Sequence, residues 1–173
     1  MKALILYESY FGNTRRIAET VAAGVADRGV DTHITAIENA PVTVPADVDI
    51  LILGAPTHNR HLPSPKSREK ALAAGAQTSD QGVAEWLTAV ELNSEPYAAI
   101  FDTSTGKNWL SGSAAKHAAK LLAHREPPLR AITKTFLVDS NEGPLTDGEL
   151  DAARTWGRLL AADARALRIP PNT

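Results

Sequence analysis

The sequence predicts an α/β protein: a doubly wound, five-stranded parallel sheet with helices on both faces. Short apolar runs alternate along the chain with segments whose apolar residues recur at helical spacing. The run 3–7 is apolar throughout and the run 48–53 is apolar apart from Asp49, as expected of strands that are covered on both faces. The length of 173 residues suits one domain with a proper core.

The first strand, residues 3–7, leads through a short loop into the first helix. In this helix Ile17, Val21 and Val25 recur every four residues, and Gly29 is expected to end it. Each later apolar run is followed by a polar or helical segment, so the strands are joined by crossovers, which are right-handed in parallel sheets. The other four strands are expected at residues 32–37, 48–53, 97–101 and 131–138.

The remaining helices are predicted from composition and from cap residues. Residues 67–76 have helix-forming composition, and residues 79–80 are expected to cap a further helix. Residues 112–124 form the next one. Thr146 and Glu149 are three residues apart, which predicts a capping box at the start of the last helix.

Composition and charge exclude several classes of function. A net charge of −2 gives no footprint for nucleic acid, and the absence of cysteine excludes disulfides, thiolate metal sites and cysteine nucleophiles. No apolar run approaches the roughly 20 residues of a membrane span, and no signal-type segment precedes the first strand. We expect a cytoplasmic protein without nucleic-acid partner or membrane insertion, with one domain over residues 1–169 and a short tail, residues 170–173.

The loop after the first strand, residues 9–14, has the features of an anion site. It joins a strand to a helix N-terminus, where the N–H groups lack partners and the dipole is positive. Gly12 lets the backbone approach a guest, and Ser9, Asn13 and Thr14 offer side-chain donors. The loop matches neither the Walker A motif nor the dinucleotide fingerprint, so a single phosphate is the best guest. The alternative is that Asn13 or Thr14 only caps the helix.

Two further polar loops follow the third and fourth strands. Residues 54–65 and 102–109 are rich in Gly, Pro, Ser and Thr. In an open α/β sheet, ligands bind at the carboxyl edge of the strands, where the strand order switches. We therefore expect the three loops to form one site.

The first loop resembles the phosphate loop of flavodoxin-like FMN-binding proteins, whose usual form is Thr/Ser-x-Thr-Gly-Asn-Thr. Ser9, Gly12, Asn13 and Thr14 match this pattern, and Phe11 replaces a hydroxyl residue. The order and length of the predicted elements match the family over nearly the whole chain. The resemblance implies a flavodoxin-like sheet with the strand order 2-1-3-4-5.

The resemblance also implies a function and a cofactor site. The function is cytoplasmic electron transfer with FMN, to a redox partner protein or a small electron acceptor, and the redox chemistry belongs to the flavin. Residues 54–58 and 103–106 stand where the second and third flavin loops of the family stand. The implied FMN-binding residues are Ser9, Tyr10, Phe11, Gly12, Asn13, Thr14, Pro56, Thr57, His58, Asn59, Arg60, His61, Thr103, Ser104, Thr105, Gly106 and Trp109.

Two alternatives to electron transfer stay open. The chain could be a flavodoxin-like reductase of NAD(P)H/quinone type, an FMN-dependent oxidoreductase, which NAD(P)H consumption with a quinone would reveal. It could also be a non-enzymatic module whose degenerate site binds no flavin, which cofactor retention would decide. His58 and His61 supply only two ligands, so we expect no metal site.

The second loop and the residues after it are predicted to be basic. Between His58 and Lys70 the formal charge is +4 −1 = +3, because this stretch contains four basic residues and one acidic residue, Glu69. The basic residues are Arg60, Lys66, Arg68 and Lys70. Positive charge favours an anionic form of a neighbouring group. We therefore expect a higher reduction potential than acidic flavodoxins show. Trp109, in the third loop, is the aromatic residue expected to stack on a ligand.

Overall fold

A five-stranded parallel sheet forms the centre of the protein, seen in a computed structural model that describes residues 1–58, 60–77, 80–106 and 112–168. Its order is β2-β1-β4-β6-β7, which is 2-1-3-4-5 when only the strands of this sheet are counted. The predicted fold class and strand order are thus confirmed. The strands are β1 (Lys2–Tyr7), β2 (Asp31–Ala36), β4 (Ile50–Pro56), β6 (Tyr97–Ser104) and β7 (Ala131–Leu137).

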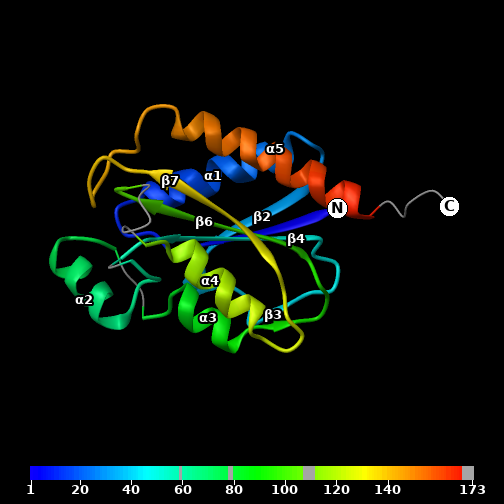
Figure 1. The fold of residues 1–173 in the computed structure, drawn as a ribbon, viewed down its shortest axis with the longest axis horizontal. Helices are drawn as coiled ribbons and strands as arrows, with labels where there is room; N and C mark the ends of the chain where they lie inside the picture. Colours follow the sequence, from blue (N-terminus) through cyan, green and yellow to red (C-terminus); the bar gives the residue numbers. More distant parts are fainter. Residues whose placement is uncertain (59, 78–79, 107–111, 169–173) are drawn as a thin grey trace.

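Helices cover both faces of the sheet (Figure 1). Helices α1 and α5 pack on one face and α3 and α4 on the other, while α2 lies beside the carboxyl ends of the strands, at the left of the view. The bounds are α1 (Asn13–Ala26), α2 (Pro65–Ala73), α3 (Val83–Ala89), α4 (Ala114–Ala123) and α5 (Glu149–Arg168).

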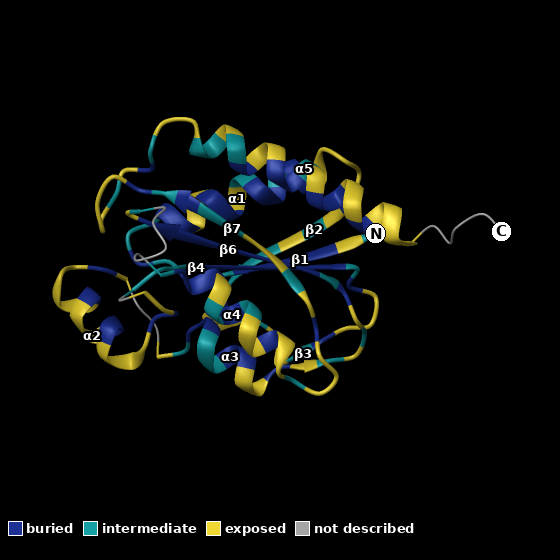
Figure 2. Ribbon diagram, in the orientation of Figure 1, coloured by how far each residue is buried: buried dark blue, intermediate teal, exposed yellow. Residues whose placement is uncertain are grey.

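Two hydrophobic cores fill the space between the sheet and its helices. Successive strand residues point to opposite faces, so Ile5 joins the core under α1 and α5, and Leu4 and Leu6 join the core under α3 and α4. Trp156 and Trp86 anchor the two cores from the helix side. Figure 2 accordingly shows the largely buried central strands β1, β4 and β6 between helices whose outer faces are exposed.

Local signals misplaced the starts of two helices. Helix α3 begins after Gly82, later than the predicted cap at residues 79–80, of which residue 79 lies outside the described residues. Helix α5 begins at Glu149, and the predicted capping box is not formed. The Thr146 hydroxyl donates instead to Asp139 Oδ1 at 2.8 Å, and the Glu149 N–H donates to the Thr146 carbonyl at 3.2 Å. The Thr146 hydroxyl thus bonds the Asp139 side chain in place of an N–H group of the helix.

The connection after β2 contains structure that was not predicted. A 3-10 turn, Ile37–Asn39, follows the strand, and β3 (Thr43–Val44) pairs in parallel with β5 (Glu91–Leu92). This second sheet lies outside the main one and positions no loop of the site. Within the described ranges, no helix is both long and apolar enough to cross a membrane.

Helices α1 and α5 pack closely and are joined at one end by an ion-pair cluster. A Cβ on Gly24 would lie 2.1 Å from the carbonyl oxygen of Arg154, so the helices need a glycine there to approach so closely. Asp27 follows α1 and accepts hydrogen bonds from Arg154 Nη2 at 2.8 Å and from Arg158 Nε at 2.8 Å. The hydrogen bonds from Arg154 and then Arg158 lower the pKa of Asp27 from 3.8 to about 2.

This cluster predicts how the Asp27→Asn variant behaves with pH. A carboxyl group with a lowered pKa in the folded state stabilises it above the unfolded pKa, and the gain is lost as the pH falls through the folded pKa. We expect Asp27→Asn to melt at a lower temperature than the wild type at pH 7. The difference in melting temperature between the variant and the wild type should disappear as the pH falls from 3.8 to about 2. Circular dichroism melts across this range measure it.

The control for this experiment is Glu69→Gln, which changes an exposed carboxylate on α2. It should melt within about 2 °C of the wild type, since surface changes away from specific contacts usually alter stability by at most about 0.5 kcal/mol. A gap for Asp27→Asn that stays constant down to pH 2 would contradict the assignment.

Candidate functional site

The predicted loops meet in one hollow at the carboxyl edge of the sheet. It encloses about 380 Å³, including open solvent at its mouth. Residues from all three predicted loops line it, together with two from a fourth loop after β7. The predicted residues are Ser9, Tyr10, Phe11, Asn13, Thr14, Pro56, Thr57, His58, Thr103, Ser104 and Thr105, and the others are Val138 and Asn141.

The remaining predicted residues fall into two groups. Gly12, Arg60, His61 and Gly106 belong to the same loops but do not line this hollow. Asn59 and Trp109 lie outside the described residues, so their predicted roles stay predictions. The fourth loop could have been found from the sequence, because the polar residues after β7 leave the same edge as the other three loops.

The first loop presents the start of α1 to the hollow. Gly12 precedes the helix with φ +85°, a left-handed conformation that glycine adopts without strain. The Arg16 N–H bonds the Gly12 carbonyl, and the Arg15 N–H bonds Ser9 Oγ at 3.2 Å. The two N–H groups before these, at the first helical positions, have no intrahelical acceptor. The site therefore offers backbone donors at the positive end of a helix dipole.

Asn13 and Thr14 tie this loop to its neighbours. Neither caps the helix, so that alternative is wrong: the N-cap is Gly12. The Asn13 amide donates to the Glu142 carbonyl at 3.0 Å, and the Thr14 and Thr103 hydroxyls lie 2.9 Å apart in a buried contact. A Cβ on Gly143 would lie 2.6 Å from Asn13 Nδ2. The fourth and third loops thus fix the two side chains that open α1.

Thr57 joins the second loop to α4 through a buried carboxylate. Its hydroxyl donates to Asp102 Oδ2 at 2.8 Å and accepts from the Ala114 N–H at 2.9 Å. The same oxygen of Asp102 accepts from the Ser113 hydroxyl at 2.6 Å and the Ala115 N–H at 3.1 Å. Thr57 lines the hollow, yet its hydroxyl is engaged on both sides. It shapes the site and holds the start of α4.

The two histidines of the second loop are held apart by their ring contacts. Their backbones pair through reciprocal hydrogen bonds of 3.1 and 2.9 Å. His58 packs edge-on against Tyr10 with ring centroids 4.9 Å apart, and His61 packs against His117 at 5.3 Å. Burial lowers the pKa of His58, which favours the neutral imidazole at pH 7. No group of three or more potential metal ligands occurs among the residues that the structure describes.

Tyr10 lines the hollow, but its hydroxyl is engaged inside the protein. Its side chain is buried, and its hydroxyl donates to Glu8 Oε1 at 2.6 Å. Burial, and then the neighbouring Glu8, raise the pKa of Tyr10. Phe11 is half-buried and also lines the hollow, so it is the more exposed of the two aromatic residues of this loop.

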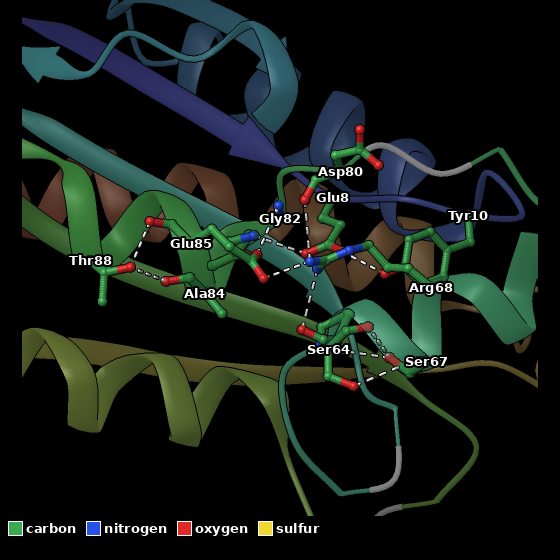
Figure 3. Close-up of polar contacts among 12 residues, drawn as sticks. Glu8, Tyr10, Ser64, Ser67, Arg68, Asp80, Gly82, Ala84, Glu85 and Thr88 are labelled. Carbon is green, nitrogen blue, oxygen red and sulfur yellow. Dashed lines mark hydrogen bonds and ion pairs between the residues drawn. The ribbon is translucent and has the colours of Figure 1, made fainter.

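The predicted charge of the second loop needs a correction. Arg68 is 4% exposed and its guanidinium reaches Glu8 and Glu85, so its charge is compensated inside the protein (Figure 3). The exposed charge of this stretch is therefore smaller than the predicted +3. Burial raises the pKa of Glu8. Glu8 could have been noticed from the sequence, because it is an acidic residue that directly follows the apolar run 3–7.

A second hollow of about 770 Å³, again with open solvent included, adjoins the first. The two share Phe11, Thr57, His58 and Asn141. Helix α2 contributes Ser67, Lys70 and Ala71 to its wall, Ala74 follows at the end of this helix, and Glu142 lies on the other side. The site thus continues from the start of α1 toward α2.

The contacts of Thr57 predict the behaviour of Thr57→Val. Valine keeps the shape but leaves the Ala114 N–H without its acceptor and Asp102 without one donor. We expect a loss of about 1–3 kcal/mol in the free energy of unfolding, measured by urea denaturation.

The matched control is Thr88→Val, because the exposed Thr88 hydroxyl bonds only carbonyls of its own helix. It should change the free energy of unfolding by less than about 0.5 kcal/mol. Equal losses in the two variants would contradict the role given to Thr57.

Comparisons with known proteins agree with this geometry. The sequence profile of the flavodoxin domain matches residues 4–67, which include the loop before α1 and the whole second loop. No curated relative matches the chain.

Solved structures with similar folds include flavodoxins over their full length. A flavodoxin from the domain Archaea is 20% identical, with 95% of this chain and 99% of that chain covered and a TM-score of 0.59. Flavodoxin 1 from Bacillus cereus is 16% identical, with 98% and 100% covered and a TM-score of 0.63. Rubredoxin oxygen:oxidoreductase from Desulfovibrio gigas is 18% identical, with 97% and 37% covered and a TM-score of 0.61.

These matches confirm the resemblance inferred from Ser9, Gly12, Asn13 and Thr14. The structural likeness covers nearly the whole chain, whereas the sequence match covers its first part. Residues 4–67 of this protein match the sequence profile of the flavodoxin domain, and the chain as a whole has the flavodoxin-like fold.

Proposed function

We propose that this protein binds FMN in the hollow at the sheet edge and transfers electrons through it. The observation that carries the proposal is that the start of α1 and residues of four loops line one hollow. The flavodoxin-domain match covers the loop that presents this helix start. When bound, FMN would supply the redox chemistry.

The donors of the first loop suit a phosphate. The N–H groups of Asn13 and Thr14 lack intrahelical acceptors. The Ser9 hydroxyl accepts from the Arg15 N–H and keeps its own proton to donate. No Asp or Glu side chain lines the first hollow in the described part of the chain, so no carboxylate opposes an anion there. These groups would hold the FMN phosphate.

The second and third loops would hold the remainder of the cofactor. Pro56, Thr57 and His58 line one side of the hollow, and Thr103, Ser104 and Thr105 belong to the next strand and loop. His58, whose pKa is lowered by burial, would present a neutral imidazole. The cytoplasmic location and the identity of the redox partner remain part of the proposal.

A second candidate function is reduction of a small acceptor such as a quinone with NAD(P)H as donor. The adjoining hollow favours it, because its walls include Lys70 and the shared residues Phe11 and His58. A small molecule in this hollow would lie beside the proposed cofactor site. A pure carrier would not need such a space.

The test of the proposal is a fluorescence titration of the purified protein with FMN, followed by reduction with dithionite under nitrogen. Saturable quenching and reversible bleaching of the flavin absorption are expected. Absence of quenching would overturn the proposal. Consumption of NADPH with added quinone would identify the reductase, and reoxidation without any NADPH consumption would identify the carrier.

The contact between Gly143 and Asn13 gives a sharper test of the site. Alanine at Gly143, where φ is +106°, would displace the Asn13 amide and with it the start of α1. We expect Gly143→Ala to raise the dissociation constant for FMN about tenfold, a loss of about 1.4 kcal/mol.

Gly148→Ala is the matched control. Gly148 also has a left-handed φ, +84°, but a Cβ there would have no atom within 4 Å. Its backbone strain should lower the melting temperature without changing FMN affinity. Equal affinities of the two variants would contradict the role given to Asn13.

A further inference from the structure

A buried carboxylate lies directly beside the phosphate-binding loop. Glu8 is 4% exposed. Its Oε1 accepts from the Tyr10 hydroxyl at 2.6 Å and from Arg68 Nη1 at 3.4 Å, and its Oε2 accepts from the Val83 N–H at 2.9 Å. Figure 3 shows these groups converging from separate parts of the chain.

Arg68 connects this carboxylate to two helices. The residue belongs to α2, and its Nη2 donates to Glu85 Oε1 of α3 at 2.6 Å. It also reaches the carbonyl oxygens of Pro63 and Asp80, each at 3.4 Å. One guanidinium thus joins the end of β1, the start of α2 and the start of α3. Arg68 lines neither hollow of the site.

The positions of Glu8 and Tyr10 explain why this network concerns the site. They are the two neighbours of Ser9 in the chain, and both of their side chains enter the network. The Ser9 hydroxyl instead meets the Arg15 N–H of α1. The Tyr10 carbonyl also accepts from the Gln77 N–H at 3.2 Å. The loop is therefore held on both sides of the residue that would donate to a phosphate.

Stability alone is a poor reason for this arrangement. Burying ionised groups is costly, and apolar residues of similar volume are often as stabilising or more so. What hydrogen-bonded charges add is a single defined geometry, since each donor and acceptor must find its partner. A Cβ on Gly82 would lie 2.5 Å from Arg68 Nη1 and 2.6 Å from Glu8 Oε2, so the network packs directly against a position where only glycine fits.

We propose that Glu8, Tyr10 and Arg68 are positioning residues that hold the phosphate-binding loop in its binding conformation. Arg68 acts from a distance, through Glu8, without contacting the ligand. The inference rests on the proposed function, because it assigns these residues to the phosphate end of the FMN site.

The test compares FMN with riboflavin, which has the same ring and ribityl chain but no phosphate. We expect Arg68→Met to raise the dissociation constant for FMN about tenfold and that for riboflavin less than twofold. Tyr10→Phe removes one hydroxyl and should fold where Arg68→Met fails to. We expect it to raise the FMN constant about fivefold, again with little effect on riboflavin. Fluorescence quenching gives the dissociation constants of the wild type and of both variants for FMN and for riboflavin.

Arg154→Met is the matched control, because Arg154 pairs with Asp27 away from the hollow. It should lower the melting temperature and leave the ratio of FMN to riboflavin affinity unchanged. The positioning role would be overturned if Tyr10→Phe and folded Arg68→Met kept the wild-type ratio of FMN to riboflavin affinity. This includes the case in which both variants bind the two ligands more weakly by the same factor. Failure of the wild type to bind FMN would instead overturn the proposed function.

Discussion

The site depends on the parallel register of the central strands. Tyr7 of β1 lies opposite Gly54 of β4, which lies opposite Phe101 of β6. Thr103 in turn lies opposite Phe136 of β7. Because neighbouring strands run in the same direction, their following loops leave from one edge of the sheet. Every contact between the loops, including that of Thr14 with Thr103, requires this alignment.

The same constraint explains what could be predicted from the sequence. Continuous apolar runs located β1 and β4, and the polar residues after them located the loops, since both signals are local. The order of the strands followed from the family resemblance of the loop that contains Gly12 and Asn13. The fourth loop was overlooked because its residues, including Asn141, also fit an ordinary turn.

Partners far apart in the sequence could not be predicted in this way. Arg68 was counted with the other basic residues of this stretch because its neighbours in the sequence are polar, yet its partners Glu8 and Glu85 lie in other parts of the chain. Thr146 has the spacing of a helix cap but bonds Asp139. In both cases a tertiary contact outweighed a local preference, and only the folded chain brings the two groups together.

The capping of α4 has a consequence for the kind of ligand that this edge can hold. Both α1 and α4 start at the carboxyl edge, so two positive helix ends are present there. At α4 the N–H groups of Ala114 and Ala115 already donate to the Thr57 hydroxyl and to the Asp102 carboxyl group. The protein itself occupies the donors of one helix end, and those of the other are left for a guest. The edge is thus electrostatically one-sided, which suits a mononucleotide with one terminal phosphate better than a ligand that is anionic at both ends.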